Sequence, residues 1–241
     1  WFGAAPSAIS GRAQILPGPV AVSKNPDKQM GTIEGVVTFH GAVPKARVAD
    51  ESGSIQDLLQ VDAKTRGLEY VVAFLELDKP SDATASHPGT PTRLASQKPT
   101  IVDQMDSRFV PHLLAVRAGA SVAFTNSDAG NHNVRTISRE PKNEFNVFTG
   151  NGGAYQHRFF SEANHHPIRV GCDIHPWMRA WIYVFDHPFF AVTDAQGRFQ
   201  ISSIPPGRYK LILGQPDAGY SAERTMAVLR GKPARIEIQI Q

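Results

Sequence analysis

Short apolar runs recur along the chain, and most are bounded by glycine, proline or small polar residues. Isoleucines alternate with polar residues in the last such run, at Ile236, Ile238 and Ile240. Alternation with a period of two is typical of half-buried strands. The segment 54–66 instead has near-helical spacing, which predicts one short helix or helical turn. Strands are predicted at 31–39, 68–77, 100–103, 109–117, 121–126, 155–160, 168–172, 181–185, 199–201, 209–213 and 234–240.

These patterns predict an all-β fold, and the composition agrees with it. The 241 residues include 20 glycines and 18 prolines, which suit many turns rather than long helices. This length allows one large or two ordinary domains. The net charge is only +3, and Lys and Arg are scattered, which argues against a nucleic-acid partner. No apolar run approaches the length that crosses a bilayer, so we expect no transmembrane span in this chain.

Residues 1–30 differ from the rest because they contain several prolines and little periodicity. This composition predicts an extended arm or linker. The arm carries apolar side chains such as Trp1 and Phe2, which a free tail does not need. A disordered terminus is the simpler expectation, and an arm that lies on a partner or near a membrane surface is the alternative that these side chains suggest. The first residue is Trp rather than Met, so either a leader has been removed or the sequence starts late.

One stretch concentrates metal-binding chemistry. Residues 172–178 read Cys-Asp-Ile-His-Pro-Trp-Met, which provides a thiolate, an imidazole and a thioether within seven residues. Upstream, His132 supplies a second imidazole. Two imidazoles and a thiolate in one plane, with a weak axial thioether, are the donors of a type 1 (blue) copper site. The sequence thus predicts one copper ion bound by His132, Cys172, His175 and Met178. Zinc is the rival metal, but Met is a poor ligand for it.

Each of these residues also has an ordinary structural explanation. A lone buried Cys is usually a small hydrophobe, and a lone His is usually just hydrogen-bonded. Their combination at one spacing favours the metal. Other histidines are weaker candidates: His165 and His166 are adjacent in a polar turn, and His187 begins a linker. No His-x-His pair is present, so the chain offers no ligands for further coppers, and we do not expect an enzyme.

The segments around these ligands resemble a known family. Residues 122–126 (Val-Ala-Phe-Thr-Asn), 132–134 (His-Asn-Val) and 172–179 are similar to the cupredoxins, and most to the amicyanin-like proteins. Those proteins share the short Cys-x-x-His-x-x-Met loop and an Asn directly after the first His. The resemblance covers about 99–187. It implies a Greek-key β-sandwich with copper at one end.

The same resemblance implies roles for residues around the metal. Asn133 would tie the two ligand loops together. In similar proteins the second His has an exposed ring edge within an apolar patch, where a redox partner docks. We therefore expect this role for His175, with Pro176 and Trp177 forming the patch. The single cysteine cannot form an internal disulfide, and an unpaired thiol in an oxidising compartment is a liability unless a metal occupies it.

A second resemblance lies near the C-terminus. Residues 193–199 (Thr-Asp-Ala-Gln-Gly-Arg-Phe) and 204–211 (Ile-Pro-Pro-Gly-Arg-Tyr-Lys-Leu) are similar to the carboxypeptidase-regulatory, transthyretin-like β-domain. Such domains usually begin with strands like those predicted at 31–39 and 68–77. We therefore predict one split β-sandwich made of 31–98 and 188–241, with the copper domain, 99–187, inserted between its halves. A tandem of three pieces is the alternative.

Taken together, the residues predict a periplasmic or otherwise exported copper electron-transfer protein. It would act as a one-electron Cu(II)/Cu(I) carrier or as a redox subunit, either free or associated with a membrane. Its partner would be a redox protein or a membrane redox complex, bound through the His175 patch and the N-terminal arm. The alternative is a structural accessory subunit of a membrane electron-transfer complex whose copper site is vestigial or empty. A copper-delivery module ranks third because the four methionines are widely spaced.

Overall fold

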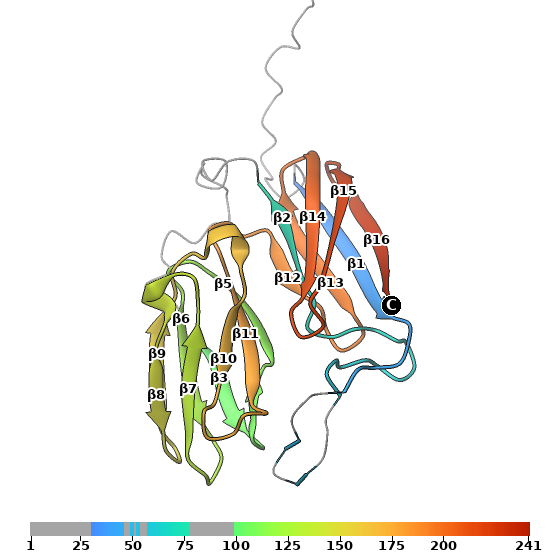
Figure 1. Ribbon diagram of the computed structural model, residues 1–241. Coiled ribbons are helices and arrows are strands. Elements are labelled where there is room, and N and C mark those ends of the chain that lie inside the picture. Colours follow the sequence, from blue (N-terminus) through green and yellow to red (C-terminus); the bar gives the residue numbers. More distant parts are fainter. Residues whose placement is uncertain (1–29, 46–48, 51, 54–56, 78–98) are drawn as a thin grey trace, which may run out of the picture.

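The computed structural model describes residues 30–45, 49–50, 52–53, 57–77 and 99–241. Within them the chain forms sixteen β-strands and two short 3-10 segments, η3 (Pro141–Asn143) and η4 (Ala163–His165). The strands form four sheets that pack in two pairs (Figure 1). The predicted fold class, all-β with two β-sandwiches, is confirmed. The predicted arm 1–30 lies outside the described residues except for Met30.

The first pair of sheets, called the terminal sandwich, combines strands from both ends of the described chain. Its strands are β1 (Gly31–Phe39), β2 (Val72–Glu76), β12 (Phe190–Val192), β13 (Arg198–Ile204), β14 (Gly207–Gln215), β15 (Tyr220–Val228) and β16 (Pro233–Ile240). One sheet has the order β13-β1-β16, in which β1 is antiparallel to β13 and parallel to β16. The other has the order β12-β2-β14-β15 and is antiparallel throughout.

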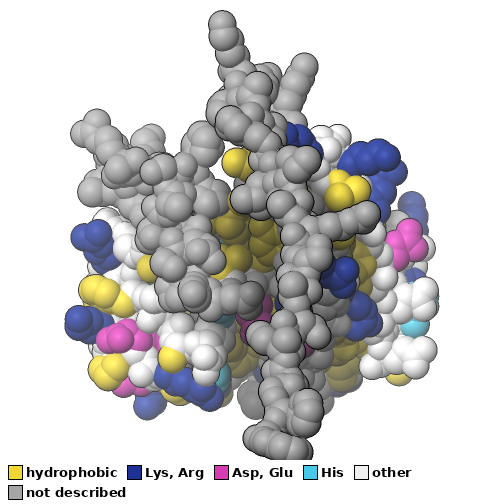
Figure 2. All heavy atoms as spheres, turned by 90° about the horizontal axis from the view of Figure 1, so that it is seen from above, with side chains coloured by type: hydrophobic (Ala, Val, Ile, Leu, Met, Phe, Trp, Pro, Cys, Tyr) yellow, Lys and Arg dark blue, Asp and Glu magenta, His cyan; other side chains and the backbone are white. Residues whose placement is uncertain are grey.

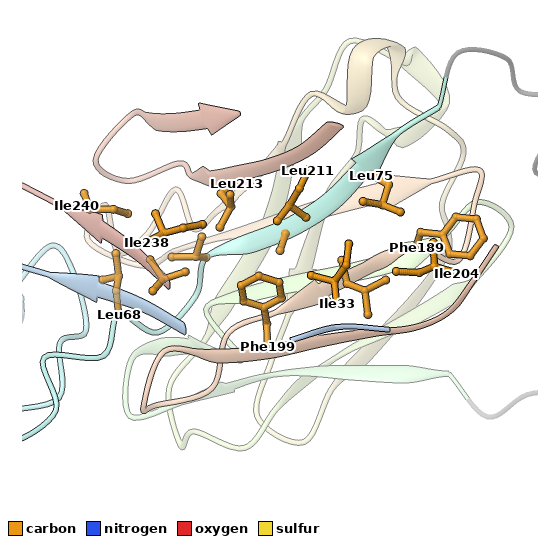
Figure 3. Packing of buried hydrophobic residues seen from close by; sticks show 14 of the residues in the cluster. Ile33, Leu68, Leu75, Phe189, Phe199, Ile204, Leu211, Leu213, Ile238 and Ile240 are labelled. Atoms are coloured by element: carbon orange, nitrogen blue, oxygen red, sulfur yellow. The ribbon is translucent and has the colours of Figure 1, made fainter. Parts of the chain in front are cut away.

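The alternating pattern of these strands places one face of each sheet in a shared core. Every second residue of β1 is buried, from Gly31 to Phe39. Figure 3 shows Ile33 of β1, Leu75 of β2 and Leu211 of β14 pointing into the same cluster. Burying a side chain of this size contributes about 1.5–3 kcal/mol. The core therefore holds together strands that are far apart in the sequence.

The second pair of sheets, called the central sandwich, is formed by the segment of the chain between β2 and β12. Its strands are β3 (Thr100–Met105), β4 (Arg108–Val110), β5 (Leu113–Arg117), β6 (Ser121–Asn126), β7 (His132–Ile137), β8 (Asn146–Thr149), β9 (Ala154–Arg158), β10 (Ile168–Gly171) and β11 (Arg179–Phe185). The sheets have the orders β5-β11-β10-β7-β8 and β4-β3-β6-β9. Phe109, Phe124 and Phe159 fill the core between them.

The two sandwiches share an apolar contact. Phe74 of β2 packs against Phe185 of β11, with ring centroids 5.0 Å apart. Val72, Leu113 and Tyr183 are buried in the same cluster. Figure 2, which looks onto the molecule from above the view of Figure 1, shows hydrophobic side chains gathered near the middle of this face.

A buried carboxylate adds a polar contact between the sandwiches. Asp217 lies in the turn between β14 and β15, and its side chain is 1% exposed. It accepts hydrogen bonds from the ring of His112 at 2.6 Å and from the indole of Trp181 at 3.1 Å, and it pairs with Arg179 at 3.0 Å. All three donors belong to the central sandwich. Burial disfavours ionisation, but these partners outweigh it and hold the pKa of Asp217 below its ordinary value.

Of the short helix or helical turn predicted at 54–66, the described part, 57–66, contains no helix but one turn at its end, where the Arg66 N–H donates to the Asp62 carbonyl at 2.9 Å. Asp57 and Val61 form isolated bridges with Lys45 and Leu68. The Asp62 carboxylate then accepts hydrogen bonds from the following backbone, which closes a turn instead of continuing a helix. Leu59 is nevertheless buried in the core, with 2% exposure, and Val61 packs against the same cluster.

Four strands were not predicted: β7, β8, β12 and β15. β7 begins at His132, where the sequence indicated a loop, and β8 lies within the polar, glycine-rich segment 137–153. β12 has only three residues, and β15 carries Glu223 and Arg224 among small and polar residues, so neither has a strong apolar alternation. Among the described residues, no helix has the length and apolar character needed to cross a membrane.

Replacing Asp217 by Ala should weaken the contact between the sandwiches. We expect the free energy of unfolding to fall by about 2–4 kcal/mol, because the change leaves three partly buried donors without their acceptor. Urea denaturation measures the loss. Asp57→Ala is the matched control: it breaks an exposed ion pair with Lys45 and should cost less than about 1 kcal/mol. Equal losses in the two variants would contradict the role given to Asp217.

Candidate metal centre

The pairing of three strands brings the predicted ligands to one end of the central sandwich. His132 is the first residue of β7, Cys172 follows the last residue of β10, and Met178 precedes β11. Gly171 of β10 is paired with Arg135 of β7 on one side and with Arg179 of β11 on the other. The loop that carries His175 therefore begins and ends beside the start of β7.

Three predicted donors converge in this region. The Nδ1 atoms of His132 and His175 are 2.8 Å apart, and the Cys172 Sγ lies 3.8 Å from His175 Nδ1. One ligand atom from each of the three residues lies within 4.8 Å of the others. His132 is 1% exposed, Cys172 is 5% exposed, and His175 is half-buried. A cluster with this exposure is shielded from water on the His132 side and accessible at His175.

Met178 is held in the same loop. Its backbone N–H donates to the carbonyl of His175 at 2.9 Å, and its carbonyl accepts from the N–H of Cys172 at 3.3 Å. These two bonds close the loop tightly. The side chain is 2% exposed and belongs to the same buried cluster as Cys172. Met178 and Cys172 therefore share one apolar environment.

Asn133 connects the two ligand loops. The Cys172 thiol donates to Asn133 Oδ1 at 3.2 Å, and the backbone N–H of Asn133 donates to Cys172 Sγ at 3.5 Å. Asn133 Oδ1 also accepts from the N–H of Asp173 at 2.7 Å. The side chain of Asn133 thereby fixes the start of β7 against the start of the metal loop.

A polar network that the sequence did not reveal extends this connection. Asn133 Nδ2 donates to Asn146 Oδ1 at 2.7 Å, and Asn146 Nδ2 donates to Asp173 Oδ2 at 2.8 Å. Asp173 also pairs with Arg135 at 3.2 Å, and this hydrogen bond lowers the pKa of the Asp173 carboxyl. Asn146 lies on β8, a strand that was not predicted. The sequence signal that could have identified Asp173 is its position directly after Cys172.

Asp128 is a further residue that the sequence analysis missed. Its Oδ2 lies 2.8 Å from Nε2 of His132, and its two oxygens accept from the N–H groups of Asp106 and Ser107 at 2.7 and 2.9 Å. Burial disfavours the charged carboxylate, but the Ser107 and His132 hydrogen bonds outweigh it and lower the pKa of Asp128. An aspartate four residues before a candidate ligand was visible in the sequence, but its contact depends on the fold.

The two residues predicted to form a docking patch lie in different environments. Pro176 is exposed, whereas Trp177 is half-buried with its ring centroid 5.0 Å from that of His175. Trp177 lines a cleft of about 890 Å³ between the two sandwiches, and its indole Nε1 is buried without a hydrogen-bond partner among the described residues. In the same loop, Ile174 is 50% exposed, and Phe148 of β8 is 65% exposed.

The residues of this cluster fit a copper ion. A thiolate and two imidazoles are the equatorial donors of a type 1 site, and a thioether suits its weak axial position. The Asp128 carboxylate can only accept a hydrogen bond, so a neutral His132 ring that bonds to it carries its proton on Nε2 and has its Nδ1 lone pair on the side of His175. A hydrogen bond to the second ring nitrogen is how metal-binding histidines are commonly oriented.

A second group of potential ligands fits a metal poorly. His165, Asp186 and His187 also bring three ligand atoms within 4.8 Å. However, His187 Nδ1 accepts a hydrogen bond from the N–H of Phe189 at 3.2 Å, so the neutral ring carries its proton on Nε2. Neither nitrogen of His187 then offers a lone pair to an ion. The rings of His165 and His187 pack against Phe185, which is the role of buried core histidines.

No family model and no curated protein matches the sequence. Among solved structures, a copper-containing nitrite reductase from Thermus scotoductus SA-01 is 24% identical, with a TM-score of 0.33, over 36% of this chain and 22% of that one. A reduced amicyanin variant is 21% identical, with a TM-score of 0.31, over 38% of this chain and 89% of its own. A purple cupredoxin from Nitrosopumilus maritimus is 22% identical, with a TM-score of 0.31, over 36% of this chain and 99% of its own. The chain thus spans about a fifth of the nitrite reductase's length.

The buried histidine His187 should make stability depend on pH. Burial lowers its pKa from 6.5 to about 4, so between these values the unfolded chain binds the proton and the folded chain does not. Stability should therefore fall as the pH drops from 6.5 toward 4, by up to about 3 kcal/mol. Urea denaturation across this range, for the natural chain and for His187→Gln, measures the effect. Parallel curves for the two proteins would show that His187 does not cause it.

Proposed function

We propose that this chain is a type 1 copper electron-transfer protein that binds one copper ion through His132, Cys172 and His175, with Met178 as the axial ligand. The observation that carries this proposal is the convergence, within 4.8 Å, of an imidazole at the start of β7 with a thiol and a second imidazole from the loop after β10. When bound, the ion supplies one-electron chemistry by cycling between Cu(II) and Cu(I).

The surrounding residues suit that role because they hold the donors still. The Asn133 N–H donates to the Cys172 sulfur and stabilises the negative charge of a thiolate there. The Asn133 side chain and the backbone bonds of Met178 keep the loop closed. A fixed donor set changes little between oxidation states, so electron transfer needs little rearrangement.

His175 is the proposed point of electron exit. It is the least buried of the three convergent donors, and Ile174 and Pro176 beside it are exposed. An apolar surface of this kind suits the small, transient interfaces of redox partners. Trp177 contacts the His175 ring from the side of the cleft, and we propose that it supports the ring there. A redox protein or a membrane redox complex in the periplasm, or in another exported location, is the partner that we propose.

The domain organisation that we propose is an insertion. Strands β1 and β2 pair with β12, β13, β14 and β16, which lie on the other side of the central sandwich in the sequence. This pairing supports a split carboxypeptidase-regulatory-like sandwich of 31–98 and 188–241, interrupted by the copper domain 99–187. An inserted unit needs its two ends close together, as compact domains commonly provide.

The purified chain loaded with Cu(II) should show an intense visible charge-transfer absorption and contain one copper by elemental analysis. Cys172→Ser should abolish the absorption, because the band requires the thiolate. Unchanged absorption in this variant would rule out Cys172 as the ligand. A natural chain that takes up no copper would instead favour a structural accessory subunit with a vestigial site.

Met178→Leu should raise the reduction potential and keep the blue absorption, because losing a weak axial donor favours Cu(I). Cyclic voltammetry measures the potential. Met105→Leu is the matched control, since Met105 is 43% exposed on β3 and does not belong to the metal loop. If the two variants have the same potential as the natural chain, Met178 is not the axial ligand.

A further inference from the structure

The carboxylate of Asp128 is unusually well fixed for a loop residue. It lies between β6 and β7, its side chain is 18% exposed, and Oδ2 contacts His132 Nε2 at 2.8 Å. The backbone around it is also tied: the Asp128 N–H donates to Asn126 Oδ1 at 3.0 Å, and its carbonyl accepts from Asn151 Nδ2 at 2.7 Å. These contacts leave the carboxylate little freedom to turn away from the imidazole.

The tight turn between β3 and β4 provides the remaining contacts. Asp106 and Ser107 both have left-handed backbone angles, with φ values of 53° and 54°. Non-glycine residues adopt this conformation at a cost of about 1–3 kcal/mol each, so it persists where the surroundings require it. Here it directs two consecutive N–H groups at the two oxygens of Asp128. A carboxylate bound in this way keeps its charge and its orientation.

The protonation of the two ligand rings follows from this arrangement. A carboxylate accepts hydrogen bonds, so His132 Nε2 carries the proton and Nδ1 keeps its lone pair. The contact of 2.8 Å between the Nδ1 atoms needs one proton between them, and in the metal-free chain His175 must supply it. Nδ1 of a neutral His132 ring therefore keeps the lone pair that a metal would bind.

We propose that Asp128 is the positioning residue of this centre: it selects the metal-binding tautomer of His132 and places a negative charge against that ring. The electronic part of this inference rests on the proposed copper function. A negative charge beside a ligand imidazole stabilises Cu(II) more than Cu(I), so Asp128 lowers the reduction potential. The backbone donors of Asp106 and Ser107 hold that charge in place.

The first test uses the metal-free chain and is independent of copper. Nitrogen-15 NMR of the imidazole groups should show His132 as a single tautomer, protonated at Nε2. In Asp128→Ala this preference should be lost, with both tautomers populated. Asp106→Asn is the matched control: it removes an exposed carboxylate from the adjoining turn, keeps the backbone donor, and suits a left-handed conformation. It should leave the spectrum unchanged. Protonation of His132 at Nδ1 in the natural chain would overturn the inference.

The second test uses the copper-loaded chain. Asp128→Asn should raise the reduction potential, since it removes the charge while keeping an acceptor for Nε2–H. Asp128→Ala should also weaken Cu(II) binding by about 10- to 100-fold, as losses of this kind commonly do. Asp106→Asn removes the same charge without touching the imidazole and should shift the potential much less. Equal shifts in Asp128→Asn and Asp106→Asn would refute a specific role for the contact.

The two tests separate this inference from the proposed function. A natural chain that binds no copper but shows the Nε2–H tautomer contradicts the function and supports the positioning of His132 by Asp128. A blue chain whose His132 has the other tautomer supports the function and overturns the inference about Asp128.

Discussion

The arrangement of the candidate metal centre depends on the pairing of β7, β10 and β11 in one sheet. Because β10 is antiparallel to both neighbours, it ends where β7 and β11 begin. This register brings His132 and the loop 172–178 together although they are far apart in the sequence. The hydrogen bonds between Asn133 and Cys172 can form only in this register. A shift by one residue would turn the side chains of β7 to the opposite face of the sheet.

The sequence was most informative where the chemistry is local. Cys172, His175 and Met178 lie in one short loop, so their spacing alone indicates a shared role. Strands β1, β6 and β16 were also predictable, because each alternates between buried and exposed positions. In these strands the alternation of apolar and polar residues in the sequence matches the alternation of buried and exposed side chains in the structure.

Other features depend on contacts between distant segments, which a pattern does not contain. Asp128 and Asn146 are ordinary polar residues in the sequence, and only the fold places them beside the ligand loops. The turn at Asp106 is similar, because its two N–H groups matter only once Asp128 lies opposite them. The described part of the segment predicted as helical, 57–66, shows the same limit: Leu59 and Val61 pack in the core cluster but do not belong to a helical repeat.

The buried carboxylate of Asp217 has a mechanical consequence for the metal loop. It is carried by a turn of the terminal sandwich, yet it binds Arg179, the residue immediately after Met178. It also accepts a hydrogen bond from Trp181 two residues later, so it contacts two residues at the start of β11. The two sandwiches cannot slide past each other while these bonds persist unless the end of the loop moves with them. A displacement of the turn between β14 and β15 would therefore also move Arg179, and with it the end of the metal loop.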